Sequence, residues 1–156
     1  MPSTSPLLDQ LTRDFPDITF HPGEQFEWKP EVQSLTYNLT DSSVNARLLH
    51  EVGHSQLKHS SYSRDIDLVA MERDAWQEAR VTLAPRYDIA ISSEEIDIDM
   101  DTYRDWLHER STCPYCESSG IQTGSKEYTC VTCRKKWQVN EARTCSLRRY
   151  KLPENK

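Results

Sequence analysis

Two cysteine pairs in the last third of the chain constrain its fold more than any other feature. Cys113 and Cys116 form one Cys-x-x-Cys motif. Cys130 and Cys133 form a second motif, and 13 residues separate the two. Two such turns can place four sulfurs around one tetrahedral zinc ion, and a reducing compartment disfavours the alternative of two disulfides. We therefore predict a four-cysteine zinc ribbon over residues 111–145, with a structural zinc on these four thiolates.

The charge balance changes sign where the cysteines begin. Residues 1–110 hold 10 Lys and Arg against 21 Asp and Glu, whereas residues 111–156 hold 9 against 4. The coincidence of the two changes indicates separate modules. We predict an acidic domain over residues 1–110, the ribbon after it, and a basic C-terminal tail over residues 146–156. The fifth cysteine, Cys145, is expected to be a free thiol.

The composition predicts a small hydrophobic core and a polar chain overall. Only 36% of the residues are hydrophobic, and the mean hydropathy is -0.78. No stretch approaches the roughly 20 apolar residues that span a bilayer. The first residues combine neither a basic region nor an apolar run, so we expect no signal peptide. These features predict a cytoplasmic protein with no membrane partner.

Three short stretches near the N-terminus have the alternation of β-strands. They are residues 18–20, 26–28 and 32–37, and a turn is expected at 21–23. Pro30 argues against one long central strand. We expect a small antiparallel sheet.

Helical periodicity follows the predicted strands. Residues 44–59 and 64–83 each carry apolar side chains at helical spacing. Ser92 and Glu95 match a capping box that opens a third helical stretch, with a break expected near 97–101. A small antiparallel sheet packed on two helices, followed by a zinc-ribbon module, gives the class α+β.

The first of these helices carries the motif that predicts chemistry. His50 and His54 are four residues apart, so on a helix they project from one face and can ligate one zinc ion. Glu51 follows the first histidine and can reach a water on that metal. For this composition, about 0.01 accidental matches to the motif are expected. The pattern predicts a catalytic zinc with Glu51 as the general base.

A catalytic zinc site normally has three protein ligands and one open position. From spacing alone, the third ligand could be His59, Glu72, Asp74 or Glu78. On a continuous helix His59 would point away from the face that carries the two histidines. Glu72 lies on the next helix, which could bring its carboxylate to the metal.

The HEVGH motif at 50–54, followed by Glu-Arg-Asp-Ala at 72–75, resembles the ImmA/IrrE-type metallopeptidases and, more widely, the gluzincins. The similarity covers roughly residues 25–90. It implies a strand at 35–38 before the active-site helix, and an edge strand that could pair with an extended peptide.

The same resemblance implies roles for individual residues. His50, His54 and Glu72 would hold the catalytic zinc, and Glu51 would be the general base. Asp74 would support a ligand through hydrogen bonding.

We therefore predict a zinc-dependent metalloendopeptidase. Residues 1–110 would form a minimal metallopeptidase domain that hydrolyses peptide bonds of a peptide or protein substrate by a zinc-bound water activated by Glu51. One alternative is a regulatory module that binds nucleic acid or protein through its zinc ribbon. A second is a protease of DNA–protein crosslinks of the SprT-like type. That family has a histidine as its third ligand, whereas no histidine lies between His59 and His108 here.

The predicted ribbon and tail interleave cations with aromatic residues. Arg-Lys-Lys-Trp occupies 134–137, and Arg-Arg-Tyr-Lys occupies 148–151. Such patterns are typical of nucleic-acid-binding surfaces. Alternatively, the positive charge offsets a four-cysteine zinc site of charge about -2 and docks on the acidic domain. From the sequence we favour structural or partner docking, with weak nucleic-acid binding.

Overall fold

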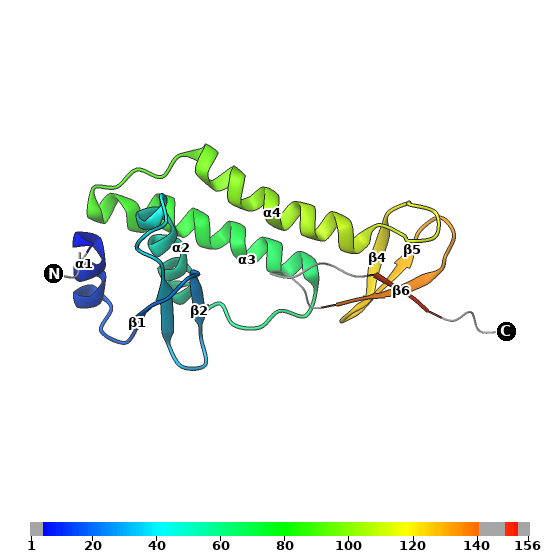
Figure 1. Cartoon of the computed structure of the whole chain (residues 1–156), viewed down its shortest axis with the longest axis horizontal. Coiled ribbons are helices and arrows are strands. Elements are labelled where there is room, and N and C mark those ends of the chain that lie inside the picture. The colour runs from blue at the N-terminus through cyan, green and yellow to red at the C-terminus, as the bar shows by residue number, and fades with distance from the viewer. Residues whose placement is uncertain (1–4, 141–148, 153–156) are drawn as a thin grey trace. The chain divides into compact units, whose positions relative to one another are not determined.

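The structure is a computed structural model that describes residues 5–140 and 149–152. Within these residues the chain is of the α+β class, as the sequence predicted, and it contains four α-helices and two small sheets (Figure 1). Cys145 and Arg148 lie outside the described residues. None of the described helices is long and apolar enough to cross a membrane.

The chain divides into two compact units. The first comprises residues 1–61 and 70–96, and the second comprises residues 62–69 and 97–156. The predicted boundary near residue 110 lies inside the second unit, because parts of two helices belong with the ribbon.

The first unit begins with helix α1, Pro6–Asp14. Its apolar residues Leu7, Leu8 and Leu11 are buried on one face. Pro6 stands at the start of the helix, where its missing N–H costs no intrahelical hydrogen bond. The burial of three leucines is what stabilises so short a helix.

A three-stranded sheet follows α1. The strands are β1 (Thr19–Pro22), β2 (Glu27–Lys29) and β3 (Ser34–Tyr37), in the order β1-β3-β2. Strand β2 pairs with β3 antiparallel, whereas β1 pairs with β3 parallel. The prediction of a fully antiparallel sheet was therefore wrong. The chain reverses after β1 and again after β2, so β1 and β3 run in the same direction, and β3 inserts between the other two.

Helix α2, Val44–Gln56, packs on this sheet. Leu48, Leu49 and Val52 are fully buried and give the helix its apolar face. The helix ends three residues earlier than the sequence predicted. The left-handed conformation of Lys58, with φ of 57°, stops the helical path there.

Helix α3, Asp65–Glu78, ends before the predicted residue 83. A π-helical turn η1 (Ala79–Leu83) and a 3-10 turn η2 (Ala84–Tyr87) follow it. Pro85 explains the change, because proline has no N–H to donate and its ring clashes with the carbonyl one turn earlier.

Helix α4, Ser93–Ser111, begins at the predicted capping box. The Ser92 N–H donates to Glu95 Oε2 at 3.0 Å, and the Glu95 N–H donates to Ser92 Oγ at 3.1 Å. The break expected near 97–101 is absent from this helix. Arg104 Nη1 lies 2.8 Å from Asp101 Oδ1, and an ion pair at this spacing of three residues stabilises a helix through its acidic stretch. Arg104 Nη2 also lies 4.0 Å from Asp97 Oδ1.

The second unit contains a four-stranded antiparallel sheet. Its strands are β4 (Gly120–Gly124), β5 (Glu127–Cys130), β6 (Lys136–Val139) and β7 (Arg149–Lys151), in that order. A cluster of buried residues forms its core: Cys113, Tyr128, Cys130, Trp137 and Val139. The rings of Tyr128 and Trp137 stack with their centroids 5.7 Å apart.

A buried ion pair within the second unit joins the first turn of α3 to the end of α4. Arg110 Nε donates to Asp65 Oδ2 at 2.7 Å, and both side chains are 3% exposed. The Tyr128 hydroxyl donates to the same oxygen at 2.5 Å. The Arg110 carbonyl accepts from Trp137 Nε1 at 2.9 Å. Each charge is thus paired and hydrogen-bonded, as burial requires.

Candidate metal centres

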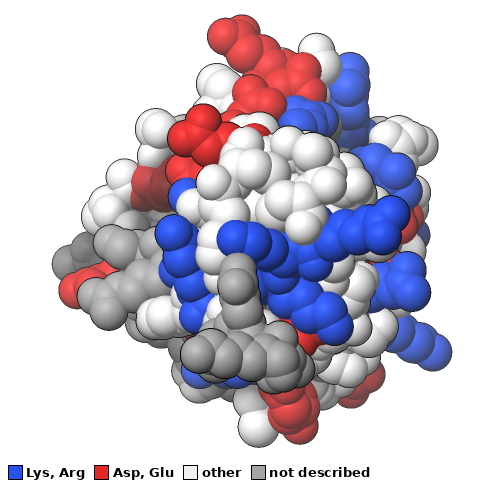
Figure 2. Space-filling model, turned by 90° about the vertical axis from the view of Figure 1, so that its right-hand side faces the viewer, with Lys and Arg blue, Asp and Glu red and all other residues white. Residues whose placement is uncertain are grey.

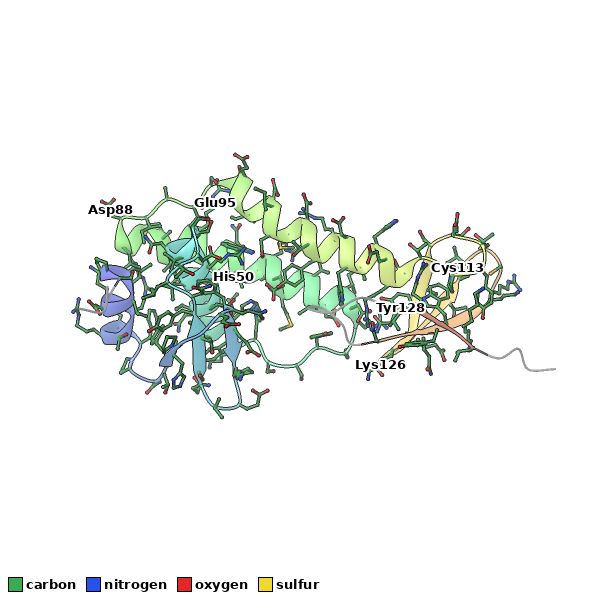
Figure 3. All side chains as sticks on the ribbon, in the orientation of Figure 1. His50, Asp88, Glu95, Cys113, Lys126 and Tyr128 are labelled. Atoms are coloured by element: carbon green, nitrogen blue, oxygen red, sulfur yellow. The ribbon has the colours of Figure 1, made fainter. Side chains whose placement is uncertain are left out.

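The first candidate centre starts from two histidines on α2, both in the first unit. His50 and His54 lie one turn apart and are 4% and 7% exposed (Figure 3 marks His50). Their Nε2 atoms are 3.1 Å apart. Because both lie on one face of α2, the helix alone brings these two nitrogens together.

Helix α3 supplies a carboxylate to the same point. Glu72 Oε2 lies 2.8 Å from His50 Nε2, and Glu72 Oε1 lies 3.2 Å from His54 Nε2. Ligands about 2.0–2.1 Å from a tetrahedral zinc ion are about 3.3 Å from one another. The three residues therefore form a group that could hold a metal ion, with a spacing and a donor set that suit zinc.

The carboxyl group of Glu72 is in the ionised form that can bind a metal ion. Its burial raises the pKa of the carboxyl, but the hydrogen bonds with His50 and His54 outweigh this effect and hold the pKa well below its usual range. The carboxylate is therefore ionised at neutral pH. Of the four candidates for the third ligand, Glu72 is the one that the structure places in the cluster with the two histidines.

Trp76 orients the first histidine. Its indole stacks on the His50 ring, with centroids 4.3 Å apart and an interplanar angle of 27°. Trp76 is 2% exposed and lies four residues after Glu72, on the same face of α3. In the sequence, Trp76 is one of the apolar side chains at helical spacing over residues 64–83. Its spacing from Glu72 is the signal that could have indicated a role at the site.

His59 contacts the second histidine. Because α2 ends at Gln56 and Lys58 is left-handed, the chain folds back and the His59 N–H donates to the His54 carbonyl at 3.0 Å. The Nδ1 atoms of His54 and His59 are then 2.9 Å apart. The expectation that His59 points away was wrong, because it assumed a helix through residue 59. Burial, and then the neighbouring His54, lower the pKa of His59.

The remaining candidate residues lie elsewhere. Asp74 is exposed and accepts a hydrogen bond from Arg73 Nη2 at 3.0 Å. Glu78 accepts one from the Thr82 hydroxyl at 3.4 Å. Glu51 is buried beside His50 and is not part of the ligand group. This position leaves its carboxylate outside the three donors that could bind a metal.

The second candidate centre consists of the four cysteines of the second unit. The sulfurs of Cys113 and Cys133 are 3.7 Å apart, and those of Cys116 and Cys130 are 3.5 Å apart. A disulfide requires about 2.05 Å, whereas thiolates on one tetrahedral zinc are about 3.8 Å apart. All four sulfurs lie within 4.8 Å of one another, so this group also could hold a metal ion.

The two cysteine motifs have the same backbone geometry. Glu117 and Arg134, each directly after a second cysteine, are left-handed with φ of 64°. The N–H of each donates to the carbonyl of the first cysteine of its motif, at 2.9 Å and 3.2 Å. The turns therefore aim both cysteine pairs inward. No sequence signal indicated these conformations, because neither residue is glycine.

Hydrogen bonds also favour thiolate at one sulfur. Backbone and side-chain hydrogen bonds with Ser118 lower the pKa of Cys116 to about 6. A thiolate is the form that binds zinc.

Comparison of the chain with protein-family models, curated proteins and solved structures gives no match.

Proposed function

We propose that the first unit is a zinc-dependent peptidase that hydrolyses peptide bonds in a peptide or protein substrate. One observation carries the proposal: the Nε2 atoms of His50 and His54 and the carboxylate of Glu72 converge on one point. Glu51 is buried next to these ligands, as the motif requires. The set of two histidines and one glutamate is that of a catalytic zinc, which keeps one position open.

The identity of the third ligand favours the resemblance to ImmA/IrrE-type metallopeptidases over that to SprT-like proteases. A glutamate on the following helix is the ImmA/IrrE-type and gluzincin arrangement. A SprT-like protease would use a histidine there. The contacts of Glu72 with both histidines therefore support the ImmA/IrrE-like proposal.

Zinc held by these residues would act as a Lewis acid and lower the pKa of a water that it binds. Glu51 accepts the proton of the attacking water. It then delivers that proton to the amide nitrogen as the carbon–nitrogen bond breaks, so that a carboxylic acid and an amine leave. His50 is held by its stacking on Trp76.

His59 acts on the ligand His54 rather than on the metal. When His54 Nε2 is a ligand, the hydrogen of that ring must lie on Nδ1. Nδ1 then donates to His59 Nδ1, 2.9 Å away. This hydrogen bond fixes the tautomer and the ring orientation of His54, which is how outer partners tune metal sites.

We also propose that the second group of ligands holds a structural zinc. Four thiolates leave no open position for a substrate, and the spacing of the sulfurs suits zinc. Under this proposal the metal stabilises the ribbon and takes no part in hydrolysis.

The Glu51→Gln variant tests the proposed peptidase. It keeps the size and hydrogen bonding of the side chain but removes the base. We expect peptide hydrolysis to fall by about two orders of magnitude or more, with zinc content unchanged. Products from an unfolded protein substrate would be measured by mass spectrometry, and Glu31→Gln, an exposed glutamate in the first unit, is the matched control.

His50→Ala should lose both the metal and the activity. If Glu51→Gln cleaves at the wild-type rate with its zinc bound, the proposed role of Glu51 is wrong and the hydrolysis comes from another site or a contaminant.

A further inference from the structure

Exposed cations gather on one face of the ribbon unit (Figure 2). Five of them define what we call the basic face: Arg134, Lys135, Lys136, Arg149 and Lys151, all exposed. The described residues 111–140 and 149–152 contain only two acidic residues, Glu117 and Glu127. The basic face is therefore a region of positive potential that attracts an anionic partner.

Two of these cations are held in place by one aromatic ring. Lys135 Nζ lies 4.7 Å from the centroid of the Tyr115 ring, and Lys151 Nζ lies 4.8 Å from the same centroid. The Tyr115 hydroxyl donates to the Leu152 carbonyl at 3.2 Å, which fixes the ring. Lysine side chains normally lose entropy when they bind an anion, and this arrangement reduces that cost.

Strand β7 adds an exposed aromatic residue between two cations. Tyr150 is 47% exposed and lies between Arg149 and Lys151 along the strand. It pairs in register with Gln138 of β6, so its side chain lies on the sheet face opposite to Trp137, and this face also carries Lys136. Arg149 and Lys151 alternate with Tyr150 and are directed to the other face of the sheet.

Because β7 is the last strand in the order β4-β5-β6-β7, the Tyr150 ring lies at an edge of the described sheet. A nucleic-acid strand that crosses this edge meets Tyr150 and Lys136 on one face of the sheet and Arg149 and Lys151 on the other. Aromatic rings combined with cations in this way bind single-stranded nucleic acid.

We propose that the basic face binds single-stranded nucleic acid, with Lys135, Lys151 and their neighbours on phosphates and Tyr150 stacked on a base. An acidic polypeptide would use the charges but has no planar base to stack on Tyr150. A positive charge that only offsets the four thiolates does not require two lysines ordered over one ring. The structure thus favours nucleic acid, whereas the sequence alone favoured docking.

Fluorescence anisotropy with the full zinc-loaded chain and a labelled 20-nucleotide oligo-dT tests this binding. Three to four phosphate contacts predict a loss of affinity of about 20–50-fold between roughly 50 and 200 mM salt. Lys135→Gln/Lys151→Gln should weaken binding and reduce the slope of log affinity against log salt by about 1.4. Tyr150→Ser should cost about tenfold, and Tyr150→Phe should cost little.

Two variants control for charge and folding. Lys29→Gln/Arg104→Gln removes two exposed charges elsewhere and should leave binding unchanged. Lys135→Arg/Lys151→Arg keeps the charges and should retain binding even if the glutamine pair loses its fold. The proposal is overturned if the arginine pair binds no oligo-dT. It is also overturned if poly-glutamate of matched length binds as tightly as oligo-dT, since an acidic polypeptide would then be the partner. None of these readouts depends on peptidase activity.

Discussion

Gly53 of α2 lies against the carbonyl of Ala75 of α3. A Cβ at position 53 would be 2.6 Å from the Ala75 oxygen, so the two helices approach at a distance that only glycine permits. Glycine inside a helix costs about 1 kcal/mol relative to alanine, and the close approach offsets this cost. Ala75 lies between Glu72 and Trp76, so the contact sets how near these two residues come to the histidines.

Gly53→Ala should therefore disturb the site although alanine favours helix. We expect a loss of stability of about 1–3 kcal/mol from overpacking, and weaker zinc binding at the His/His/Glu centre. Thermal unfolding and chelator competition would measure both. Asn45→Ala, on the exposed side of α2, is the matched control and should leave zinc binding unchanged. Wild-type zinc affinity in Gly53→Ala would show that the helix spacing does not set the site.

Glu72→Gln should release the zinc that we propose for the His/His/Glu centre. The substitution removes the charge that contacts both histidines, so the affinity should fall by more than the roughly 10–100-fold that loss of an outer partner costs. Chelator competition at neutral pH measures the affinity. Glu78→Gln, on the same helix, serves as the control and should retain the metal. Equal losses in the two variants would argue against Glu72 as the ligand.

The hydrogen bond between His54 and His59 predicts that two substitutions at position 59 weaken zinc binding to different degrees. His59→Leu removes the acceptor and should weaken zinc binding by about 10–100-fold. His59→Gln keeps an oxygen that can accept from His54 Nδ1, so it should recover part of the affinity. Nitrogen NMR of the zinc-loaded protein would report the His54 tautomer directly. A His54 ring without hydrogen on Nδ1 in the wild type would contradict the proposed role.

The two candidate metal centres should differ in how readily a chelator removes their metal ions. The freshly purified, zinc-supplemented chain should carry two zinc ions by native mass spectrometry. Mild chelation should remove the one at the open His/His/Glu centre first. His50→Ala should lose the labile ion and Cys113→Ser the resistant one. A single bound zinc in the wild type would refute the two-site description.

The buried ion pair between Asp65 and Arg110 should contribute to the stability of the fold. Asp65→Ala leaves Arg110 as an uncompensated buried charge, so we expect a loss of about 3–5 kcal/mol in the free energy of unfolding. Asp67→Ala, an exposed residue on the same helix, should change it by less than about 1 kcal/mol. Denaturant unfolding of the zinc-loaded protein measures both. Similar losses in the two variants would show that the pair contributes little.

Local spacing in the sequence was enough to predict part of both centres. Two histidines four apart meet on any helix, because the turn length is set by the backbone. Two Cys-x-x-Cys turns likewise carry their own geometry. The capping box at Ser92 and Glu95 is equally local, since its hydrogen bonds span three residues.

Packing between distant segments determined what local spacing leaves open. Spacing alone left Glu72, Asp74 and Glu78 open as the third ligand, and the family resemblance pointed to Glu72. The packing of α3 on α2 at Gly53 brings Glu72 to the two histidines. The left-handed turn at Lys58 returned His59 to His54, although a non-glycine residue seldom adopts that conformation. Strand direction in the first sheet depended on the insertion of β3 between β1 and β2. These outcomes depend on contacts between residues distant in sequence, whose free energies no short pattern contains.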